Sequence, residues 1–315
     1  MALPDPHLRP VRPGGSEQAS FPSLAELALL LPQYEMEQVI GVGGMGAIYK
    51  ARHRALGRSV AIKVLPQESS DQPEEIERFI KEARAMAKLK HPQIVTVFDF
   101  GQTAQRHLYL VMEFVDGLDL HRRIRFRELN TERIFSIVDQ LCDALQFAHA
   151  QGVIHRDIKP ANILISSDWR VKVVDFGLAR EISLQGAGQE VEYGTPDYTS
   201  PERLILGAAV DHRADIYALG VLIHEMFTGH TTTAAQPEDG ALLPGGVAAV
   251  IARCTAEDPD QRFGSAMEVK TALFSPAPST RTVVRVAGSS CAAAMKKTTL
   301  AARAAAFLRG FRARR

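Results

Sequence analysis

The run GVGGMG, from Gly41 to Gly46, separates two segments that both have the pattern of a β-strand. Residues 34–42 alternate loosely between apolar and polar side chains, and residues 47–52 continue as a second strand. The spacing GxGxxG also marks dinucleotide-binding turns, but there a helix follows the glycines. Because a strand follows here, we expect a glycine-rich hairpin that can approach a phosphate chain closely, with a merely flexible loop as the alternative.

Strand patterns dominate the first part of the chain, and helical patterns dominate the rest. Beyond the hairpin, further strands are expected in three apolar segments: residues 59–65, the run HPQIVTVFDFG and the run HLYLVMEFV. A helical pattern covers about residues 74–90. From Asn130 onward the pattern is mainly helical, interrupted by short apolar runs at 162–165 and 171–174. The sequence therefore predicts a strand-rich lobe followed by a helix-rich lobe.

The first 32 residues are expected to lie outside the main domain. They begin with a stretch rich in Pro, Gly and Ser, which predicts disorder, and end in a short helix over 24–31 that Ser23 can cap. No signal peptide is expected, and the apolar run LAELALLL is too short to span a bilayer. Three widely spaced cysteines indicate neither a disulfide framework nor a zinc site, so a reducing, cytoplasmic location is predicted.

Residues 276–315 differ from the rest of the chain in charge. They contain nine basic and no acidic side chains, so residues 1–275 carry 28 basic and 36 acidic ones, a balance of −8. This composition does not favour a nucleic-acid partner. We expect a disordered or partly helical basic tail, whose last part, 296–315, makes at most weak contact with a membrane or an acidic partner.

A lysine with apolar neighbours follows the glycine run by 17 positions. Lys63 ends the sequence VAIK, and an ammonium group on a buried strand needs a partner. Glu82 lies on the expected following helix and can provide that partner. From these two residues alone, a purely structural ion pair is as good an interpretation as a functional one.

Two later motifs indicate that the glycine run and Lys63 belong to one functional site. Residues 155–162 read HRDIKPAN, and DFG follows at 175–177. With GxGxxG, VAIK and the Ser-Pro-Glu at 200–202, these motifs stand in the order of the protein-kinase signature set. The chain resembles the eukaryotic-like, Hanks-type serine/threonine protein kinases of bacteria over about residues 33–275.

This resemblance implies an α+β, bilobal protein-kinase-like fold. It has a small β-rich N-lobe at 33–114 and a larger helical C-lobe at 115–275, shortened after its central helix because residues 231–240 replace a longer substrate-docking element. The implied function is transfer of the γ-phosphate of ATP to Ser or Thr hydroxyls of proteins, including the chain itself. The alternatives are a pseudokinase that serves as an ATP-binding scaffold and, third, a kinase acting on metabolites.

The resemblance also implies roles for individual residues. Asp157 would accept or orient the proton of the incoming hydroxyl, and Lys159 would stabilise charge on the γ-phosphate. Lys63, held by Glu82, would bind the α- and β-phosphates. Asn162 belongs to the same catalytic set.

The implied cofactors are ATP and Mg²⁺, with Mn²⁺ as an alternative metal. Asn162 and Asp175 are hard oxygen ligands suited to such an ion. The residues implied in nucleotide binding are Gly41, Val42, Gly43, Gly44, Gly46, Ile48, Ala61, Lys63, Met112, Glu113, Val115, Leu164 and Asp175.

The segment between DFG and Ser-Pro-Glu departs from the family pattern. Ser183 is its only hydroxyl before Tyr193, whereas Glu190 and Glu192 stand near the place of the usual phosphate. One hypothesis is that a glutamate pairs with Arg156 and replaces phosphorylation, and the alternative is a solvated acidic loop.

Three further residue roles follow from the resemblance and concern the fold. Glu202 should pair with Arg262, Asp215 should anchor the backbone of the catalytic loop, and Thr195 should bond Asp157 and Lys159.

Overall fold

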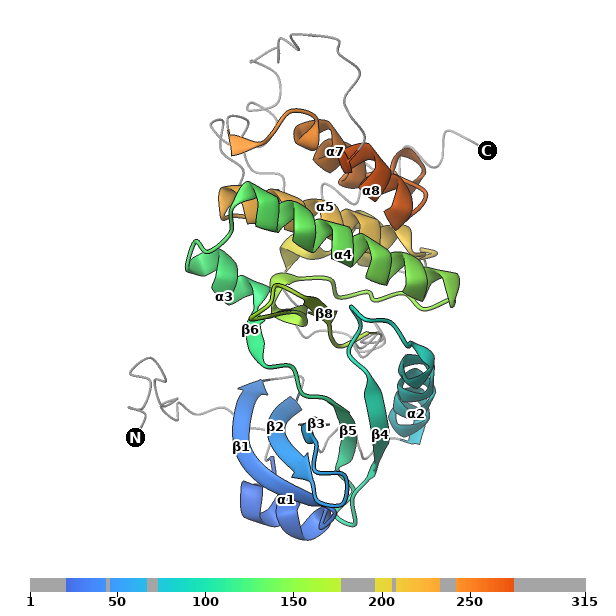
Figure 1. The fold of residues 1–315 in the computed structure, drawn as a ribbon. Coiled ribbons are helices and arrows are strands. Elements are labelled where there is room, and N and C mark those ends of the chain that lie inside the picture. The colour runs from blue at the N-terminus through green and yellow to red at the C-terminus, as the bar shows by residue number, and fades with distance from the viewer. Residues whose placement is uncertain are drawn as a thin grey trace, which may run out of the picture. The chain divides into compact units, whose positions relative to one another are not determined.

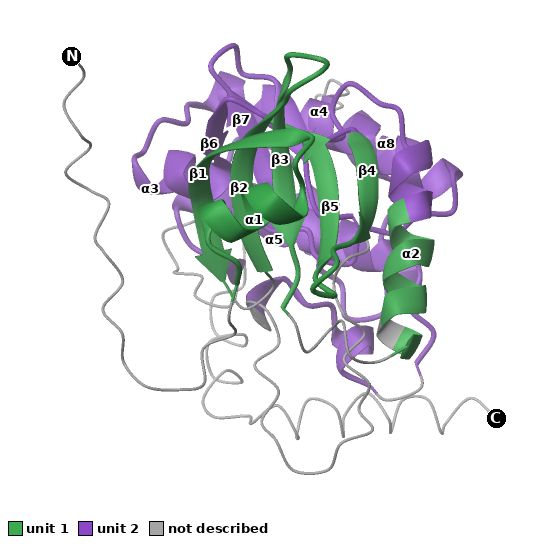
Figure 2. Cartoon of the chain, turned by 90° about the horizontal axis from the view of Figure 1, so that it is seen from below, with its two compact units in different colours: residues 1–83, 97–114 green, residues 84–96, 115–315 purple. Residues whose placement is uncertain are grey.

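The computed structural model describes six stretches of the chain: residues 21–43, 46–66, 73–176, 196–205, 208–232 and 242–274. The chain divides into two compact units, which Figure 2 shows in different colours. Unit 1 comprises residues 1–83 and 97–114, and unit 2 comprises residues 84–96 and 115–315. Within the described stretches, no helix is both long and apolar enough to cross a membrane.

Unit 1 is built on a five-stranded antiparallel sheet with the strand order β1-β2-β3-β5-β4 (Figure 1). Its strands are β1 (Tyr34–Gly43), β2 (Gly46–His53), β3 (Ser59–Val64), β4 (Val97–Gln102) and β5 (Leu108–Glu113). The predicted glycine hairpin is confirmed, since β1 and β2 pair up to Gly43 opposite Gly46. Two register shifts in β1 mark bulges, which bend the strand.

The two faces of this sheet carry different side chains. Tyr49, Val60, Ile62, Val64 and Val111 belong to one hydrophobic core. Side chains alternate between faces along a strand, and cross-strand partners share a face. The opposite face therefore carries two rows of cross-strand partners: Ile48, Lys63 and Leu110, and Lys50, Ala61 and Met112. Four residues predicted to bind nucleotide thus lie on one face of the sheet.

Helix α1 (Leu24–Leu30) covers the core face of the sheet (Figure 2). The predicted cap is confirmed: the Ser23 hydroxyl accepts the Glu26 N–H at 3.3 Å, and the Glu26 carboxylate accepts the Ser23 N–H at 2.8 Å. Leu27 is fully buried in the core, and the Tyr49 hydroxyl donates to the Pro22 carbonyl at 2.6 Å. The predicted start of the kinase domain at residue 33 falls between α1 and the sheet, although the two share one hydrophobic core.

The run HPQIVTVFDFG, residues 91–101, does not form one strand as its pattern suggests. Only its end belongs to β4 in unit 1, whereas residues 84–96 belong to unit 2. The reason is tertiary pairing: the Val95 N–H donates to Val173 at 3.0 Å, and the Val173 N–H donates to Gln93 at 2.8 Å. Helix α2 (Pro73–Lys88) confirms the predicted helix and passes from one unit into the other.

In its described residues, unit 2 combines five α-helices with a small sheet in the order β6-β7-β8. Its strands and helices are β6 (Gly117–Asp119), α3 (Leu120–Arg125), α4 (Thr131–Ala150), β7 (Ile163–Ser166), β8 (Val171–Val173), α5 (Arg213–Thr228), α7 (Val247–Cys254) and α8 (Ala266–Phe274). Figure 1 shows α4 alongside α5 and α8. Helix α5 is buried on most of its circumference, as expected for a central helix. At Gly220 a Cβ atom would lie 2.5 Å from the Cys254 Cβ, so glycine allows α7 to pack closely.

Candidate active site

Asp215 on α5 fixes the backbone of the loop that carries the HRDIKPAN motif. Its two carboxylate oxygens accept the backbone N–H groups of His155 and Arg156, each at 2.8 Å. The His149 imidazole on α4 lies 2.8 Å from the same carboxylate. Burial acts to raise the pKa of Asp215, but the hydrogen bonds and nearby imidazoles hold it below its ordinary value. The predicted anchoring role of Asp215 is therefore consistent with its contacts.

His155 joins this loop to the end of β8. The imidazole is fully buried, and burial lowers its pKa, so the ring is neutral near pH 7. Its Nε2 lies 2.9 Å from the Val174 carbonyl and must carry the proton, because that carbonyl can only accept. Nδ1 then accepts the Asp157 N–H at 3.2 Å. The ring also packs against Phe176, with 4.5 Å between ring centroids.

The Asp157 carboxylate has one oxygen engaged and one available. The Lys159 ammonium lies 2.9 Å from Oδ2, and the Asn162 amide nitrogen donates to the same oxygen at 2.8 Å. Oδ1 has no hydrogen-bond partner among the described residues. The carboxylate is held in place from one side, and its other oxygen can accept a proton from an incoming group.

Asn162 is oriented by the loop in the same way. Its amide nitrogen donates to both the backbone carbonyl and the carboxylate of Asp157, at 2.7 and 2.8 Å. The side-chain amide oxygen of Asn162 therefore faces away from these contacts and has no partner in the described part of the chain, whereas its backbone carbonyl accepts the Val174 N–H at 3.0 Å. Asp175 follows β8 with a φ of 61°, a conformation that is uncommon for a residue with a side chain.

These oxygens fit a divalent cation that also binds phosphate. A carboxylate and an amide oxygen are the ligand types that Mg²⁺ prefers. Across the described stretches, no cluster of three His, Cys, Asp or Glu side chains could hold a metal alone. An ion at Asn162 and Asp175 would need further oxygens from water or a nucleotide.

In unit 1, glycine occupies positions of the hairpin for two different reasons. Gly46 has a φ of 134°, and a Cβ atom there would lie 2.5 Å from the Val64 carbonyl oxygen, so the fold requires glycine. At Gly41 and Gly43, a Cβ atom would meet no protein atom within 4 Å. Packing within the protein therefore does not require glycine at these two positions. A ligand whose phosphate approaches the hairpin backbone closely would require it.

Lys63 lies on β3 with only 4% of its surface exposed. Glu82 lies on α2 in the same unit, half-buried. Met112 and Glu113 end β5, Val115 is the second residue after it, and Leu164 lies on β7 of unit 2. All of these predicted site residues except Val115 lie on a strand or a helix.

Residues 34–274 match the family described as "Protein kinase domain". The chain belongs to the protein kinase family. The match agrees within one residue at each end with the resemblance expected over 33–275. The predicted fold class, with a β-rich N-lobe and a helical C-lobe, is confirmed by both the match and the elements of the two units.

Bacterial serine/threonine-protein kinases are among the relatives of the kinase domain. It is 38% identical over 263 residues to the serine/threonine-protein kinase Pkn1 of Myxococcus xanthus, covering 76% of this chain and 38% of the relative. It is 36% identical over 268 residues to PknB of Mycobacterium tuberculosis, covering 78% of this chain and 43% of the relative. The chain therefore spans less than half the length of these relatives. The crystal structure of the Mycobacterium tuberculosis PknI kinase domain is similar with a TM-score of 0.64 and 31% identity, over 76% of this chain and 95% of that one.

Sequence reasoning missed His149 in the kinase domain. Its side chain is 7% exposed and bonds Asp215, which lies 66 positions later. The signal was available, because His149 follows Cys142 and Leu145 by seven and four positions on the buried face of α4. A polar side chain on such a face needs a buried partner.

Glu225 on α5 is a second buried group that the sequence did not single out. Its carboxylate accepts a hydrogen bond from the Tyr198 hydroxyl, which fixes the segment before Ser-Pro-Glu to the central helix. Burial, with a smaller contribution from the negative charge of Asp197, raises the pKa of Glu225 to about 7, and His230 opposes the shift.

This raised pKa predicts how stability depends on pH. The folded state binds the Glu225 proton more tightly than the unfolded state, so stability is lost as pH rises from about 4.5 to about 7. We expect Glu225→Gln to remove about 1 to 3 kcal/mol of that pH dependence. Urea unfolding of the parent protein and the Glu225→Gln variant at pH 5 and pH 8 measures this difference. Glu257→Gln, which changes an exposed carboxylate, is the control and should keep the pH dependence of the parent. Equal pH dependence in the Glu225→Gln variant and the parent protein would contradict the assignment.

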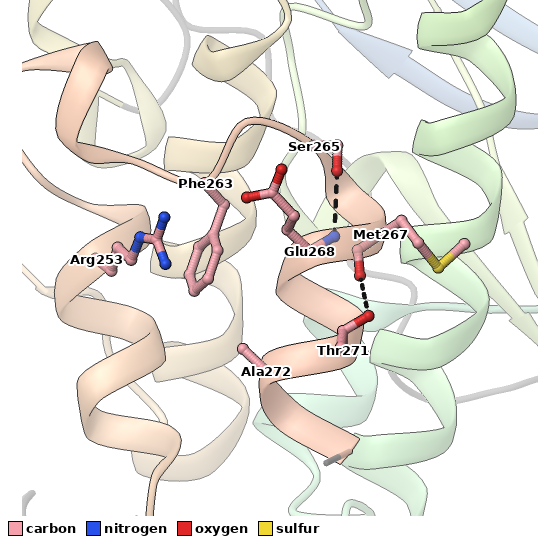
Figure 3. A pocket seen from close by; sticks show the side chains of 7 residues that line it. All are labelled: Arg253, Phe263, Ser265, Met267, Glu268, Thr271 and Ala272. Atoms are coloured by element: carbon pink, nitrogen blue, oxygen red, sulfur yellow. Dashed lines mark hydrogen bonds between the residues drawn. The ribbon is translucent and has the colours of Figure 1, made fainter.

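The pocket drawn in Figure 3 has a volume of about 360 Å³ and lies in unit 2. Its lining residues are Arg253, Phe263, Ser265, Met267, Glu268, Thr271 and Ala272. Several of its polar groups serve the fold: the Ser265 hydroxyl accepts the Glu268 N–H at 3.2 Å, and the Thr271 hydroxyl donates to Met267 at 2.8 Å. No predicted site residue lines this pocket.

Several predictions concern residues outside the described stretches. They are Gly44 in the hairpin turn, Ser183, Glu190, Glu192 and Thr195 in the segment after DFG, and the tail 276–315. The proposed pairing of a glutamate with Arg156 therefore stays a hypothesis.

Proposed function

We propose that this kinase domain is an active serine/threonine protein kinase that transfers the γ-phosphate of ATP to hydroxyls of proteins. The observation that carries the proposal is the arrangement around Asp157. Lys159 and Asn162 both engage Oδ2, and Oδ1 is left to accept a proton. The names of the bacterial relatives, serine/threonine-protein kinases, support the same substrate class.

Each unit supplies one part of the chemistry. In unit 1, the backbone of the glycine hairpin and the Lys63 ammonium offer donors to phosphate oxygens, and the sheet face with Ile48, Ala61 and Met112 offers apolar surface to adenine. In unit 2, Asp157 Oδ1 would accept the hydroxyl proton as the oxygen attacks phosphorus. Lys159, already beside Asp157, would stabilise negative charge on the transferred group.

The family uses ATP with a divalent metal, and we propose Mg²⁺ as that metal. Asn162 and Asp175 would hold it, and when bound it supplies positive charge that offsets the charge of the phosphates. The orientation of the Asn162 amide supports this role, because its nitrogen is occupied by Asp157 and its oxygen is free to bind a cation.

The pseudokinase alternative has no specific observation in its favour. Asp157, Lys159, Asn162, Asp175 and Lys63 are all present, and the first three are already arranged around one carboxylate. We propose the cytoplasm as the place of action, which the two buried, free cysteines Cys142 and Cys254 support.

The test is transfer of labelled phosphate. Purified protein with Mg²⁺ and γ-labelled ATP should label a generic protein substrate on serine or threonine, and should label itself. Mass spectrometry identifies the modified residues, and chelation of the metal should stop the reaction. ATP binding without transfer to any protein would overturn the proposal and favour the scaffold alternative. Transfer to a small metabolite alone would favour a metabolite kinase.

A further inference from the structure

A group of arginines gathers at α3, on a body that is otherwise acidic. Residues 117–133 contain five arginines and three acidic side chains, whereas residues 1–275 as a whole have a balance of −8. Arg122, Arg125, Phe126 and Arg127 are all exposed, and the Phe126 side chain has 60% of its surface exposed. We call these four residues the α3 patch.

Two other arginines nearby serve the fold, which separates them from the patch. Arg123 forms an ion pair with Glu128 and lies over the Trp169 ring, 4.9 Å from its centroid. Arg133 lies over the same ring at 3.9 Å and donates to the Glu128 carbonyl at 2.7 Å. These contacts fix the α3–α4 connection and the base of the patch.

The patch itself is poorly neutralised. Arg122 has an acidic neighbour, Asp119, at 3.4 Å, with more than half of its side chain still exposed. Arg125 and Arg127 have no acidic partner among the described residues. Arg122, Arg125 and Phe126 are spaced i, i+3 and i+4, so they share one side of α3.

Arg127 stands where the backbone favours glycine. Its φ is 54°, in the left-handed region directly after the helix cap, and glycine is the usual residue there. The carbonyl of Ile124 accepts its N–H at 2.9 Å, so this backbone is fixed. Arg127 thus places a guanidinium where the backbone geometry favours glycine. The other members of the α3 patch add two more guanidiniums and the exposed Phe126 ring.

We propose that the α3 patch binds acidic segments of the proteins that this kinase domain phosphorylates, which rests on the function proposed above. A planar guanidinium binds a carboxylate through two parallel hydrogen bonds, and Phe126 adds apolar contact. Three such groups on one short helix and its cap fit a peptide of a few acidic residues. An anionic membrane surface calls for larger basic clusters, of four to eight Lys or Arg, than the three arginines of the α3 patch.

The first experiment compares two peptides that differ only in charge. Each carries one phosphorylatable residue and a run of either four glutamates or four glutamines, placed before or after it. We expect the glutamate peptide to have a KM about tenfold lower with similar kcat, and the difference to shrink as salt is raised. Equal KM values for both peptides, in both placements, would overturn the proposal.

A matched pair of variants assigns the effect to the patch. Arg125→Ala with Arg127→Gly removes two guanidiniums without breaking an ion pair, and glycine suits the backbone at 127. We expect this variant to lose the preference for glutamate and to keep its rate on the glutamine peptide. Lys88→Ala with Lys90→Ala removes two exposed charges elsewhere in unit 2 and should keep the preference. If the first variant phosphorylates both peptides less efficiently by the same factor, the patch serves the fold and the proposal fails.

Direct binding separates this proposal from the proposed function. Trp169, the one tryptophan of the chain, touches Arg123 on α3 and reports on that region by its fluorescence. A glutamate peptide without a phosphorylatable residue should change that fluorescence saturably in the parent protein and not in the Arg125→Ala, Arg127→Gly variant. This result holds whether or not phosphate is transferred. No response to the peptide, or a response only to phosphatidylserine vesicles, would overturn the proposal.

Discussion

Replacing Asp157 with asparagine should lower the rate of phosphate transfer by about 100- to 10,000-fold, because a general base contributes a factor of that size. Asparagine has nearly the same shape, and its oxygen can still accept the bonds from Lys159 and Asn162. The fold and the affinity for ATP should therefore stay within about twofold of the parent protein, since the substitution keeps in place both Lys159, which would meet the γ-phosphate, and Asn162, which would hold the metal.

The measurement combines single-turnover transfer of labelled phosphate with an independent titration of ATP. The control is Asp168→Asn, which changes an exposed carboxylate of the same unit that pairs with Ser166 and Arg170. It should transfer phosphate at the parent rate. A variant at Asp157 that keeps more than a tenth of the activity would show that another group takes the proton.

Replacing Arg262 with alanine should destabilise unit 2 by about 3 to 5 kcal/mol, because it leaves a buried carboxylate without its partner. Arg262 is 3% exposed and Glu202 is 5% exposed, and two nitrogens of the guanidinium donate to the two carboxylate oxygens at 2.8 Å. The remaining donors reach the carbonyls of Arg213, Ala256 and Glu257. This guanidinium connects the segment after Tyr198 to the turn between α7 and α8.

Urea unfolding of the parent and the variants measures the loss. Arg170→Ala breaks an ion pair whose two side chains are 78% and 55% exposed, and it should cost less than about 1 kcal/mol. The double variant Arg262→Met, Glu202→Leu removes both charges and should recover part of the loss. If Arg262→Ala costs no more than Arg170→Ala, the buried pair does not stabilise the fold as we infer.

The sequence could predict what depends on short-range signals. Ser23 followed by Glu26 is a capping box, and helix α1 begins directly after Ser23. Asp157, Lys159 and Asn162 stand within six residues of one loop, and the structure places the Lys159 and Asn162 nitrogens 2.9 and 2.8 Å from the same Asp157 oxygen. The pair Glu202 and Arg262 is also confirmed, although it was inferred from the family resemblance and not from spacing.

The features that the sequence did not predict depend on partners far along the chain. Strand β6 has only three residues, and it is a strand because Leu118 pairs with Ile165. The run at 91–101 looks like one strand, but Val95 finds its hydrogen-bond partner in Val173. His149 could be placed on the buried face of a helix, but nothing local names Asp215 as its partner. Tertiary pairing decides all three cases, as it often does for short strands.

The core of unit 1 has a consequence for protein synthesis. Leu27 and Leu31 leave the ribosome early, but Val111, which completes the same core, follows 84 positions after Leu27. Residues 84–96 of unit 2 are made in between, so neither unit can close in simple chain order. A nascent chain that stalls before Val111 would lack β5, so the edge of β3 and the part of the core that Val111 completes would stay uncovered, and such surface is what chaperones bind. Translation speed over the first 114 residues should therefore affect the yield of folded protein more than speed over the stretch that follows.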